Sequence, residues 1–220
     1  MNKKKYLIIG STRTGTNRVK ELIYKNFNKK YTFSLKKFHS QYIFFNKNKN
    51  YFFLNLKKKN NLSLISKKKL REQKILSTHN FSKKIIKDFN DYNLILTIRN
   101  PLETIASLTI YNTKKNILSF NPNFKIKSPI QLAYNKRLIK KYINIYNNLY
   151  LKILKKNFKK FTICNFDDSE KLIAKKLGLI PYKLKKQEFH MSKNKQPIID
   201  ILKKNYNFKE SFKIYNSLNI

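Results

Sequence analysis

The sequence is most constrained near its start, where a short apolar run passes directly into a loop bounded by two glycines. Residues 6–17 read Tyr-Leu-Ile-Ile-Gly-Ser-Thr-Arg-Thr-Gly-Thr-Asn. The apolar run that ends at Gly10 predicts a buried strand, and the residues after Gly15 predict the start of a helix. A loop at the amino end of a helix favours anions, because the helix dipole is positive there and backbone N–H groups point at the ligand. We therefore expect residues 10–17 to bind a phosphate-like group.

The spacing of the two glycines fits the phosphate loop of ATP- and GTP-binding proteins, G-x-x-x-x-G-K-[ST]. The last two positions of that motif are Thr16 and Asn17 here, so the lysine that reaches the outer phosphates of ATP is missing from its place. Arg13 supplies a cation inside the loop instead. This difference predicts a ligand other than ATP, and a P-loop kinase or other NTPase is kept as an alternative.

Segments typical of strands and helices alternate along the rest of the chain. We expect strands over residues 5–9, 32–35, 51–56, 74–80, 92–99 and 161–166. We expect helices over residues 16–27, 82–89, 101–111, 129–156, 169–177, 197–204 and 208–217. This alternation predicts an α/β fold with a mainly parallel central sheet flanked by helices. The 220 residues predict a single domain over 1–220, with 28–70 and 112–127 as variable segments on the substrate side.

Three polar stretches directly follow predicted strands: the loop 10–17, the triplet 77–79 and Arg99. Ligands of parallel α/β sheets bind beyond the carboxyl ends of the strands. We therefore expect these three stretches to meet at one edge of the sheet. Arg99 is followed by Asn100 and Pro101, which are typical of a helix start.

Two of these stretches together resemble the nucleotide motifs of sulfotransferases that use 3′-phosphoadenosine 5′-phosphosulfate (PAPS). The first motif in that family is a basic-[ST]-G-[ST]-[ST] loop, and the second is a strand ending in Arg-Asn-Pro with a serine eight residues after the arginine. The resemblance implies a three-layer P-loop-type fold and PAPS as the co-substrate. It implies that the 5′-phosphosulfate is held by Arg13, Thr14, Gly15, Thr16 and Asn17. It implies that the 3′-phosphate is held by Arg99 and Ser107.

A third match concerns the base that accepts a proton from the acceptor. Some members of the family carry a Thr-His pair at a strand end, and Thr78-His79 fits that pattern. The resemblance thus implies His79 as catalytic base, with Arg13 stabilising charge on the leaving phosphate. A carboxylate base, Glu72 or Asp88, is the alternative that the sequence leaves open. No metal is expected in this scheme.

The chain also departs from the cytosolic members of this family. Asn17 replaces a usual serine or threonine, Arg18 stands where those members have tryptophan, and Ser77 stands where they have lysine. The tail after Gly178 contains no glycine, so their closing glycine-rich segment is absent. The chain is more similar to a compact carbohydrate or bacterial-type member. We therefore expect a hydroxyl or amine acceptor, either a small molecule or a glycan, with a glycan favoured.

The composition is strongly basic, with 50 Lys and Arg residues against 11 Asp and Glu and a formal net charge of +39. Lysine, asparagine and isoleucine are abundant, which A/T-rich codons alone would produce. The surface is nevertheless expected to attract polyanions non-specifically, and a non-catalytic nucleic-acid or polyanion binder is a further alternative. The single cysteine, the scattered histidines and the lack of a long apolar run predict a cytoplasmic protein without a metal site or a membrane span.

Overall fold

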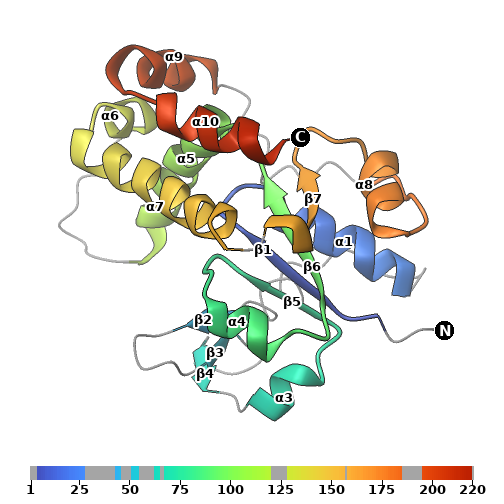
Figure 1. Ribbon diagram of the computed structural model, residues 1–220. Helices are drawn as coiled ribbons and strands as arrows, with labels where there is room; N and C mark the ends of the chain where they lie inside the picture. Colours follow the sequence, from blue (N-terminus) through green and yellow to red (C-terminus); the bar gives the residue numbers. More distant parts are fainter. Residues whose placement is uncertain are drawn as a thin grey trace. The chain divides into compact units, whose positions relative to one another are not determined.

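The computed structural model describes residues 4–27, 43–45, 51–54, 62–64, 67–119, 128–156, 158–184 and 195–219. Figure 1 shows the elements in their order along the chain. By contacts the chain divides into two compact units, Met1–Ile98 with Lys152–Leu184 and Arg99–Leu151 with Lys185–Ile220. The single domain over 1–220 stays a prediction.

The first unit contains a four-stranded parallel sheet in the order β5-β1-β6-β7. Its strands are β1 (Tyr6–Gly10), β5 (Ile75–Thr78), β6 (Asn93–Ile98) and β7 (Thr162–Asn165). In the register, Ile9 lies beside Thr78 on one side, and Gly10 lies beside Thr97 on the other. The carboxyl ends of β1, β5 and β6 are therefore level at one edge, and the expected α/β fold with a parallel central sheet is confirmed.

Both faces of this sheet are buried, as its almost continuous apolar strands require. On one face, helices α1 (Thr16–Phe27) and α8 (Glu170–Leu177) pack on a core that includes Tyr6, Ile8 and Cys164. On the other face, neighbouring residues of the same strands, such as Leu7, Ile9 and Leu96, are also fully buried. The predicted helix 16–27 has the observed bounds of α1. The first unit also contains the short helices α3 (Lys67–Arg71), α4 (Lys83–Asp88) and η1 (Phe158–Lys160).

A separate antiparallel sheet of the first unit has the strand order β2-β3-β4. Its strands are β2 (Ile43–Phe45), β3 (Tyr51–Leu54) and β4 (Leu62–Leu64). The predicted strand over 51–56 corresponds to β3, whereas the one over 32–35 lies outside the described residues. At the end of the segment 28–70, which was expected to be variable, residues 67–69 begin helix α3.

The second unit is helical and contains α5 (Pro101–Ser119), α6 (Pro129–Ala133), α7 (Lys136–Leu154, which continues past Leu151 into the first unit), α9 (Gln196–Asn205) and α10 (Lys209–Leu218). Helices α5, α6 and α9 pack against one another, and α10 packs on α5. The expected loop over 112–127 is wrong for its first part, because α5 continues to Ser119. No glycine or proline interrupts the chain before Pro122, so nothing in the sequence ends the helix earlier.

The single long helix predicted over 129–156 is wrong, because the chain forms two helices with a break at Tyr134 and Asn135. Helix α6 starts in a capping box between Ser128 and Gln131. Helix α7 has its own cap, because the Asn135 side chain accepts a hydrogen bond from the backbone N–H of Leu138 at 3.0 Å. An asparagine side chain in this role satisfies an N–H group that has no partner within the helix.

Apolar residues that recur at helical spacing through this region are only partly buried. Tyr142, Leu149 and Ile153 are buried, whereas Ile130, Tyr134 and Ile145 are exposed. The buried face of α7 instead includes Tyr146 and Tyr150, whose rings pack edge to face at 4.7 Å between centroids. The break at 134–135 shifts the helical phase, so one continuous stripe does not describe both helices.

Candidate functional site

The loop between β1 and α1 has an unusual backbone. Among the described residues other than glycine, Arg13 alone has a positive φ, +74°, and Gly15 two positions later has a φ of +91°. Arg13 and Gly15 are left-handed while Thr14 between them is not. Such alternation turns backbone N–H groups toward a common centre and forms concavities that bind anions. This geometry lies at the amino end of α1, where the helix dipole adds positive potential.

Thr14 fixes the loop against the sheet. Its hydroxyl donates to the backbone oxygen of Ser11 at 2.7 Å and lies 3.0 Å from the hydroxyl of Thr97 on β6. Because the one proton of Thr14 is used on Ser11, Thr97 is the donor of the second bond. Both threonines are fully buried. Thr97 was not among the predicted site residues. Its polar side chain within the apolar run 94–98 is the feature that could have identified it.

The two glycines of the loop are required by close packing. A Cβ atom on Gly10 would lie 2.0 Å from the Thr97 hydroxyl oxygen and 2.8 Å from that of Thr14. A Cβ atom on Gly15 would lie 2.9 Å from Cδ2 of Phe166. No larger residue fits either position without a shift of its neighbours. Phe166, which follows β7, is a second residue that the sequence interpretation missed.

His79 is joined directly to the loop. Its Nδ1 lies 2.7 Å from the backbone oxygen of Gly10. A carbonyl oxygen only accepts hydrogen bonds, so Nδ1 carries the proton and, in the neutral ring, Nε2 keeps its lone pair. The contact places a potential proton acceptor beside the first glycine of the loop. The predicted meeting of the loop and the triplet 77–79 at one edge of the sheet is thereby observed.

The two alternative carboxylates lie at the other edge of the sheet. Glu72 is exposed and precedes β5, whereas His79 follows its carboxyl end. The backbone oxygen of Asp88 accepts a hydrogen bond from Arg71, the neighbour of Glu72, at 3.0 Å. Glu72 and the backbone of Asp88 thus lie toward the amino end of β5, whereas the loop lies at the carboxyl ends of the strands.

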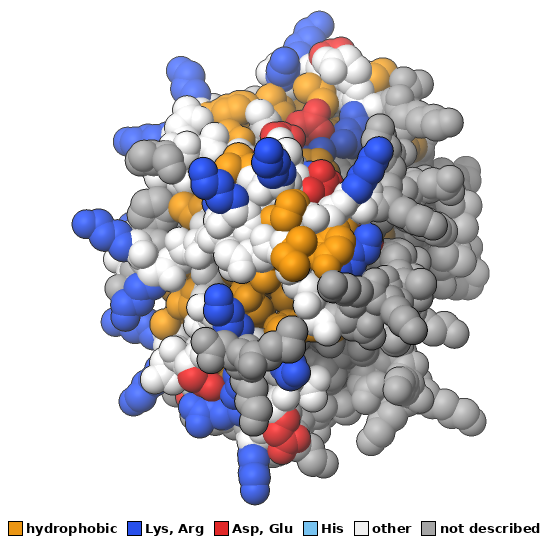
Figure 2. Space-filling view, turned by 90° about the vertical axis from the view of Figure 1, so that its right-hand side faces the viewer, with side chains coloured by type: hydrophobic (Ala, Val, Ile, Leu, Met, Phe, Trp, Pro, Cys, Tyr) orange, Lys and Arg blue, Asp and Glu red, His pale blue; other side chains and the backbone are white. Residues whose placement is uncertain are grey.

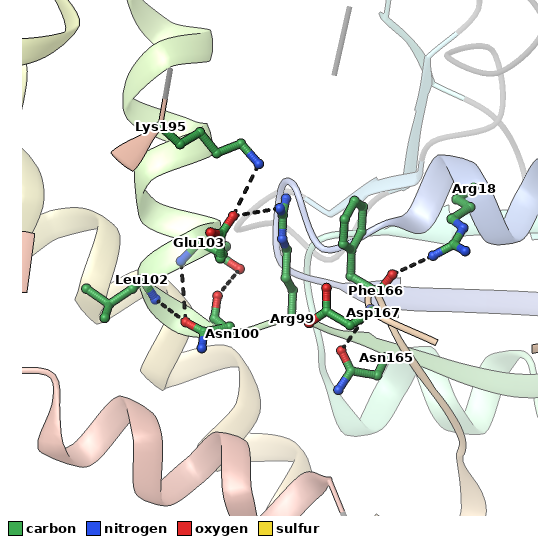
Figure 3. Close-up of polar contacts among 10 residues, drawn as sticks. Arg18, Arg99, Asn100, Leu102, Glu103, Asn165, Phe166, Asp167 and Lys195 are labelled. Carbon is green, nitrogen blue, oxygen red and sulfur yellow. Dashed lines mark hydrogen bonds and ion pairs between the residues drawn. The ribbon is translucent and has the colours of Figure 1, made fainter. Parts of the chain in front are cut away.

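Arg18 connects α1 to the segment after β7 (Figure 3). It donates to the backbone oxygen of Phe166 and forms an ion pair of 2.9 Å with Glu170, and its guanidinium lies 5.8 Å from the centre of the Phe166 ring. Burial by itself would raise the pKa of Glu170, but hydrogen bonds from its own backbone N–H and from Arg18 lower that pKa below its usual value. Arg18 stands where cytosolic members of the family have tryptophan. In this chain it joins helix α1 to the start of α8.

The second predicted motif lies at the start of the second unit, directly after the last residue of β6. The Asn100 side chain accepts a hydrogen bond from the backbone N–H of Leu102 at 3.0 Å, as the predicted helix cap requires (Figure 3). Arg99 is 5% exposed and donates to the Glu103 carboxylate at 2.9 Å. Lys195 donates to the same carboxylate oxygen at 3.2 Å.

Tyr146 and Ser107 complete the surroundings of this motif. The hydroxyl of Tyr146 donates to the backbone oxygen of Arg99 at 2.9 Å, so α7 holds the backbone at Arg99 in place. Burial, the largest cause, raises the pKa of Tyr146, so the hydroxyl keeps its proton. Ser107 is buried on α5, two helical turns after Asn100 and on the same side of that helix. Within the described residues, no group of three or more His, Cys, Asp or Glu side chains could hold a metal ion.

The comparisons with known proteins agree with the motifs. Residues 3–168 match the family described as "Sulfotransferase domain". The chain therefore belongs to the sulfotransferase domain family, as its motifs predicted. The resemblance to PAPS-dependent sulfotransferases is thus confirmed at the level of the family, and the enzyme class and PAPS as co-substrate are what that membership implies.

A search among curated proteins found no match. Among solved structures, the chain is similar to mouse sulfotransferase SULT7A1 complexed with PAP, with 16% identity and a TM-score of 0.44. This likeness covers 99% of the chain and 65% of the mouse protein, so the chain spans about two thirds of that protein's length. At this TM-score the likeness supports no further conclusion. No helix among the described residues is long and apolar enough to cross a membrane.

Proposed function

We propose that this protein is a sulfotransferase that moves the sulfuryl group of PAPS to a hydroxyl or amine acceptor. The observation that carries the proposal is the hydrogen bond between His79 and Gly10, because it joins a proton acceptor to an anion-binding loop. When bound, PAPS supplies the sulfuryl group and a phosphate leaving group. The transfer needs a base and an anion-binding loop. Both lie within the first unit.

In this proposal the loop residues hold the 5′-phosphosulfate, namely Arg13, Thr14, Gly15, Thr16 and Asn17. The donor set fits such a group, because it combines a guanidinium, the amino end of α1 and a backbone concavity. Arg13 stabilises the charge that develops on the leaving phosphate. The bond to Thr97 keeps the loop in one shape before the ligand arrives.

His79 accepts the proton of the acceptor group at Nε2. Its Nδ1–H stays on the Gly10 oxygen, which fixes both the tautomer and the direction of the ring. This arrangement favours His79 over Glu72 and Asp88, since only His79 has a hydrogen bond to the loop among the contacts described for these three residues. The catalytic residues of the proposal are thus His79 and Arg13.

Arg99 and Ser107 hold the 3′-phosphate in this proposal. Both belong to the second unit, and both are buried near the start of α5. A planar guanidinium can donate hydrogen bonds to two phosphate oxygens at once. The ion pair with Glu103 and the hydrogen bond from Tyr146 to the Arg99 backbone restrict the orientation of the arginine. For the acceptor we propose a glycan, with residues 28–70 and 112–127 contributing to its binding.

Calorimetry with adenosine 3′,5′-bisphosphate tests the nucleotide site without any knowledge of the acceptor. Titrations are made with Mg²⁺ removed, with ATP and ADP as comparison ligands. We expect selective binding of the bisphosphate that falls at least about tenfold in Arg99→Ala, the scale of a charge-assisted contact. Arg137→Ala, an exposed arginine on α7, is the matched control and should bind like wild type.

Two results would contradict this proposal. Equal weak binding of every nucleotide in all three proteins would leave only non-specific attraction by the basic surface. Tight ATP binding that depends on Mg²⁺ would instead support the P-loop kinase alternative.

A further inference from the structure

We propose that an open groove along helix α10 binds an anionic glycan chain, so that the acceptor belongs to the acidic glycans. This inference rests on the proposed function and narrows its acceptor. The groove has a volume of about 810 Å³ and is lined by the end of α9, the connection to α10, one face of α10, and Leu102 of α5. All of these residues belong to the second unit.

The charged side chains that line the groove are all positive. Four lysines line it, Lys203, Lys204, Lys209 and Lys213, and no acidic residue is among the lining residues. All four are exposed. The acidic residue of this helix, Glu210, lies outside the groove and accepts a hydrogen bond from the Asn147 side chain at 3.1 Å. The fold thus concentrates part of the chain's positive charge along this groove.

The periodicity of α10 separates its two faces. Lys209, Phe212, Lys213 and Asn216 line the groove and recur at helical spacing. The opposite face packs inward through Ile214, Leu218 and Ser211, whose hydroxyl donates to the Asn147 side chain at 2.7 Å. The lining face therefore cannot rotate into the core, and its lysines stay directed to the groove.

The chemistry of the lining suits an acidic sugar chain. Lysine ammonium groups pair with carboxylates or sulfates, and three asparagines, Asn205, Asn207 and Asn216, offer both donors and acceptors to sugar hydroxyls. The aromatic rings are less suited to single-stranded nucleic acid, whose bases need open rings for stacking. Phe208 is 6% exposed, and the Tyr206 hydroxyl donates to the Ala133 backbone oxygen at 2.8 Å, so both serve packing, which leaves Phe212 as the one further ring in the lining.

The groove also borders the predicted nucleotide motif within the same unit. Leu102 lines the groove, and its backbone N–H is bonded to the Asn100 side chain at 3.0 Å. Arg99 is the residue before Asn100. A chain bound along α10 therefore reaches the first turn of α5, close in sequence to the arginine that is proposed to hold the 3′-phosphate.

The test compares two variants of the full chain with equal charge loss. The groove variant carries Lys203→Ala, Lys204→Ala, Lys209→Ala and Lys213→Ala. The control carries Lys140→Ala, Lys141→Ala, Lys171→Ala and Lys175→Ala, which are exposed lysines outside the groove. The probes are a labelled heparin octasaccharide, a neutral maltooligosaccharide of equal length, and single-stranded oligothymidylate. Affinities are measured by fluorescence anisotropy at about 0.15 M salt, where distant charges are largely screened.

We expect the groove variant to lose at least about tenfold in affinity for the heparin octasaccharide, and the control variant to change by less than about threefold, as its four lysines do not line the groove. The neutral oligosaccharide should bind much more weakly. Equal losses in both variants would overturn the proposal, because attraction would then come from total charge. Tighter binding of oligothymidylate than of heparin, lost in the groove variant, would also overturn it in favour of a nucleic-acid site.

Calorimetry with adenosine 3′,5′-bisphosphate separates this proposal from the proposed function. The groove variant should bind the bisphosphate like wild type, since none of its four lysines is placed in the nucleotide site. Absence of bisphosphate binding in wild type would contradict the sulfotransferase activity while the glycan result stood. Normal bisphosphate binding without groove-dependent heparin binding would contradict only the acidic acceptor.

Discussion

Single residues around the first loop show how strain and close packing are concentrated where anion binding is proposed. Arg13 adopts a left-handed conformation that costs a non-glycine residue about 1–2 kcal/mol. The bond between Thr14 and Thr97 and the contact between Gly15 and Phe166 hold the surrounding backbone in place. A conformation of this kind persists only where its neighbours determine it, and such residues are common at binding sites.

His79→Asn tests the proposed base separately from nucleotide binding. With an acceptor found by screening, we expect the turnover rate to fall by about 10²–10⁴, the usual contribution of general base catalysis. Affinity for adenosine 3′,5′-bisphosphate should stay within about threefold of wild type, because His79 contacts the Gly10 oxygen and donates nothing to the ligand in this proposal. A variant that kept most of its turnover would exclude His79 as the base.

Gly15→Ala and Gly178→Ala form a matched pair, since both glycines have positive φ. A Cβ on Gly15 would meet Phe166 at 2.9 Å, whereas the nearest atom to a Cβ on Gly178 is the flexible Lys4 ammonium at 3.9 Å. We expect Gly178→Ala to lower the free energy of unfolding by about 1 kcal/mol from backbone strain alone, and Gly15→Ala to lower it by roughly twice that. Urea unfolding measures both values, and equal losses would argue against the tight contact with Phe166.

Cys164 is expected to be unreactive in the folded protein. The thiol is 1% exposed in the core, and burial raises its pKa to about 12. Because the folded pKa lies above the unfolded one, the folded state keeps its proton where the unfolded state loses it. The stability contributed by the buried thiol is thus complete below about pH 9 and is lost as the pH rises toward 12. Alkylation by iodoacetamide at pH 8 should require denaturant, and rapid labelling of the native protein would contradict the burial.

At the scale of elements, side-chain caps decide where helices begin. The capping box at Ser128 starts α6, Asn135 starts α7, and Ser169 starts α8. At α8 the Ser169 hydroxyl accepts from the Leu172 backbone N–H, whereas the neighbouring Asp168 pairs with Lys176 at 2.7 Å. Several side chains next to a helix start are able to cap it, so the correct one is decided by the path of the chain.

Asn135→Ala tests whether the break between α6 and α7 is maintained by its cap. Loss of the bond to the Leu138 N–H should lower the free energy of unfolding by about 1 kcal/mol. Asn135→Asp keeps an acceptor oxygen at this position and should stay close to wild type. If both variants unfolded at the same urea concentration as wild type, the cap would have no part in stabilising α7.

At the scale of the whole molecule, the excess of positive charge opposes compactness. In the part of one face that Figure 2 colours, lysine and arginine side chains project at many places, with fewer acidic side chains between them. The 11 acidic residues, including those in the ion pairs of Lys5 with Asp91 and Arg18 with Glu170, offset only 11 of the 50 Lys and Arg residues, which leaves the net charge of +39. Mutual repulsion of the remaining cations therefore lowers the stability of the folded state.

Sodium chloride should stabilise this protein for that reason. Raising the ionic strength from about 0.1 M to about 1 M shortens the screening length from about 10 Å to about 3 Å. We expect Tm to rise over this range, as measured by circular dichroism, and to rise in potassium chloride by the same amount. A Tm that fell with salt would show that ion pairs stabilise the fold more than repulsion weakens it.

The sequence by itself determined the local features of this protein. The strand, loop and helix over residues 6–27 and the cap at Asn100 depend on neighbouring residues, and both were predicted correctly. The parallel sheet also followed from the alternation of elements, because that pattern has few other packed solutions.

Only the tertiary structure decided which distant residues meet and which side chains are buried. The contacts of His79 with Gly10 and of Thr97 with Thr14 depend on strand register, which no single segment encodes. Lys20 is fully buried on α1, where burial lowers its pKa well below the usual value, although its residue type suggested exposure. Local patterns report what a segment prefers, whereas burial and long-range hydrogen bonds depend on the neighbours that the completed fold supplies.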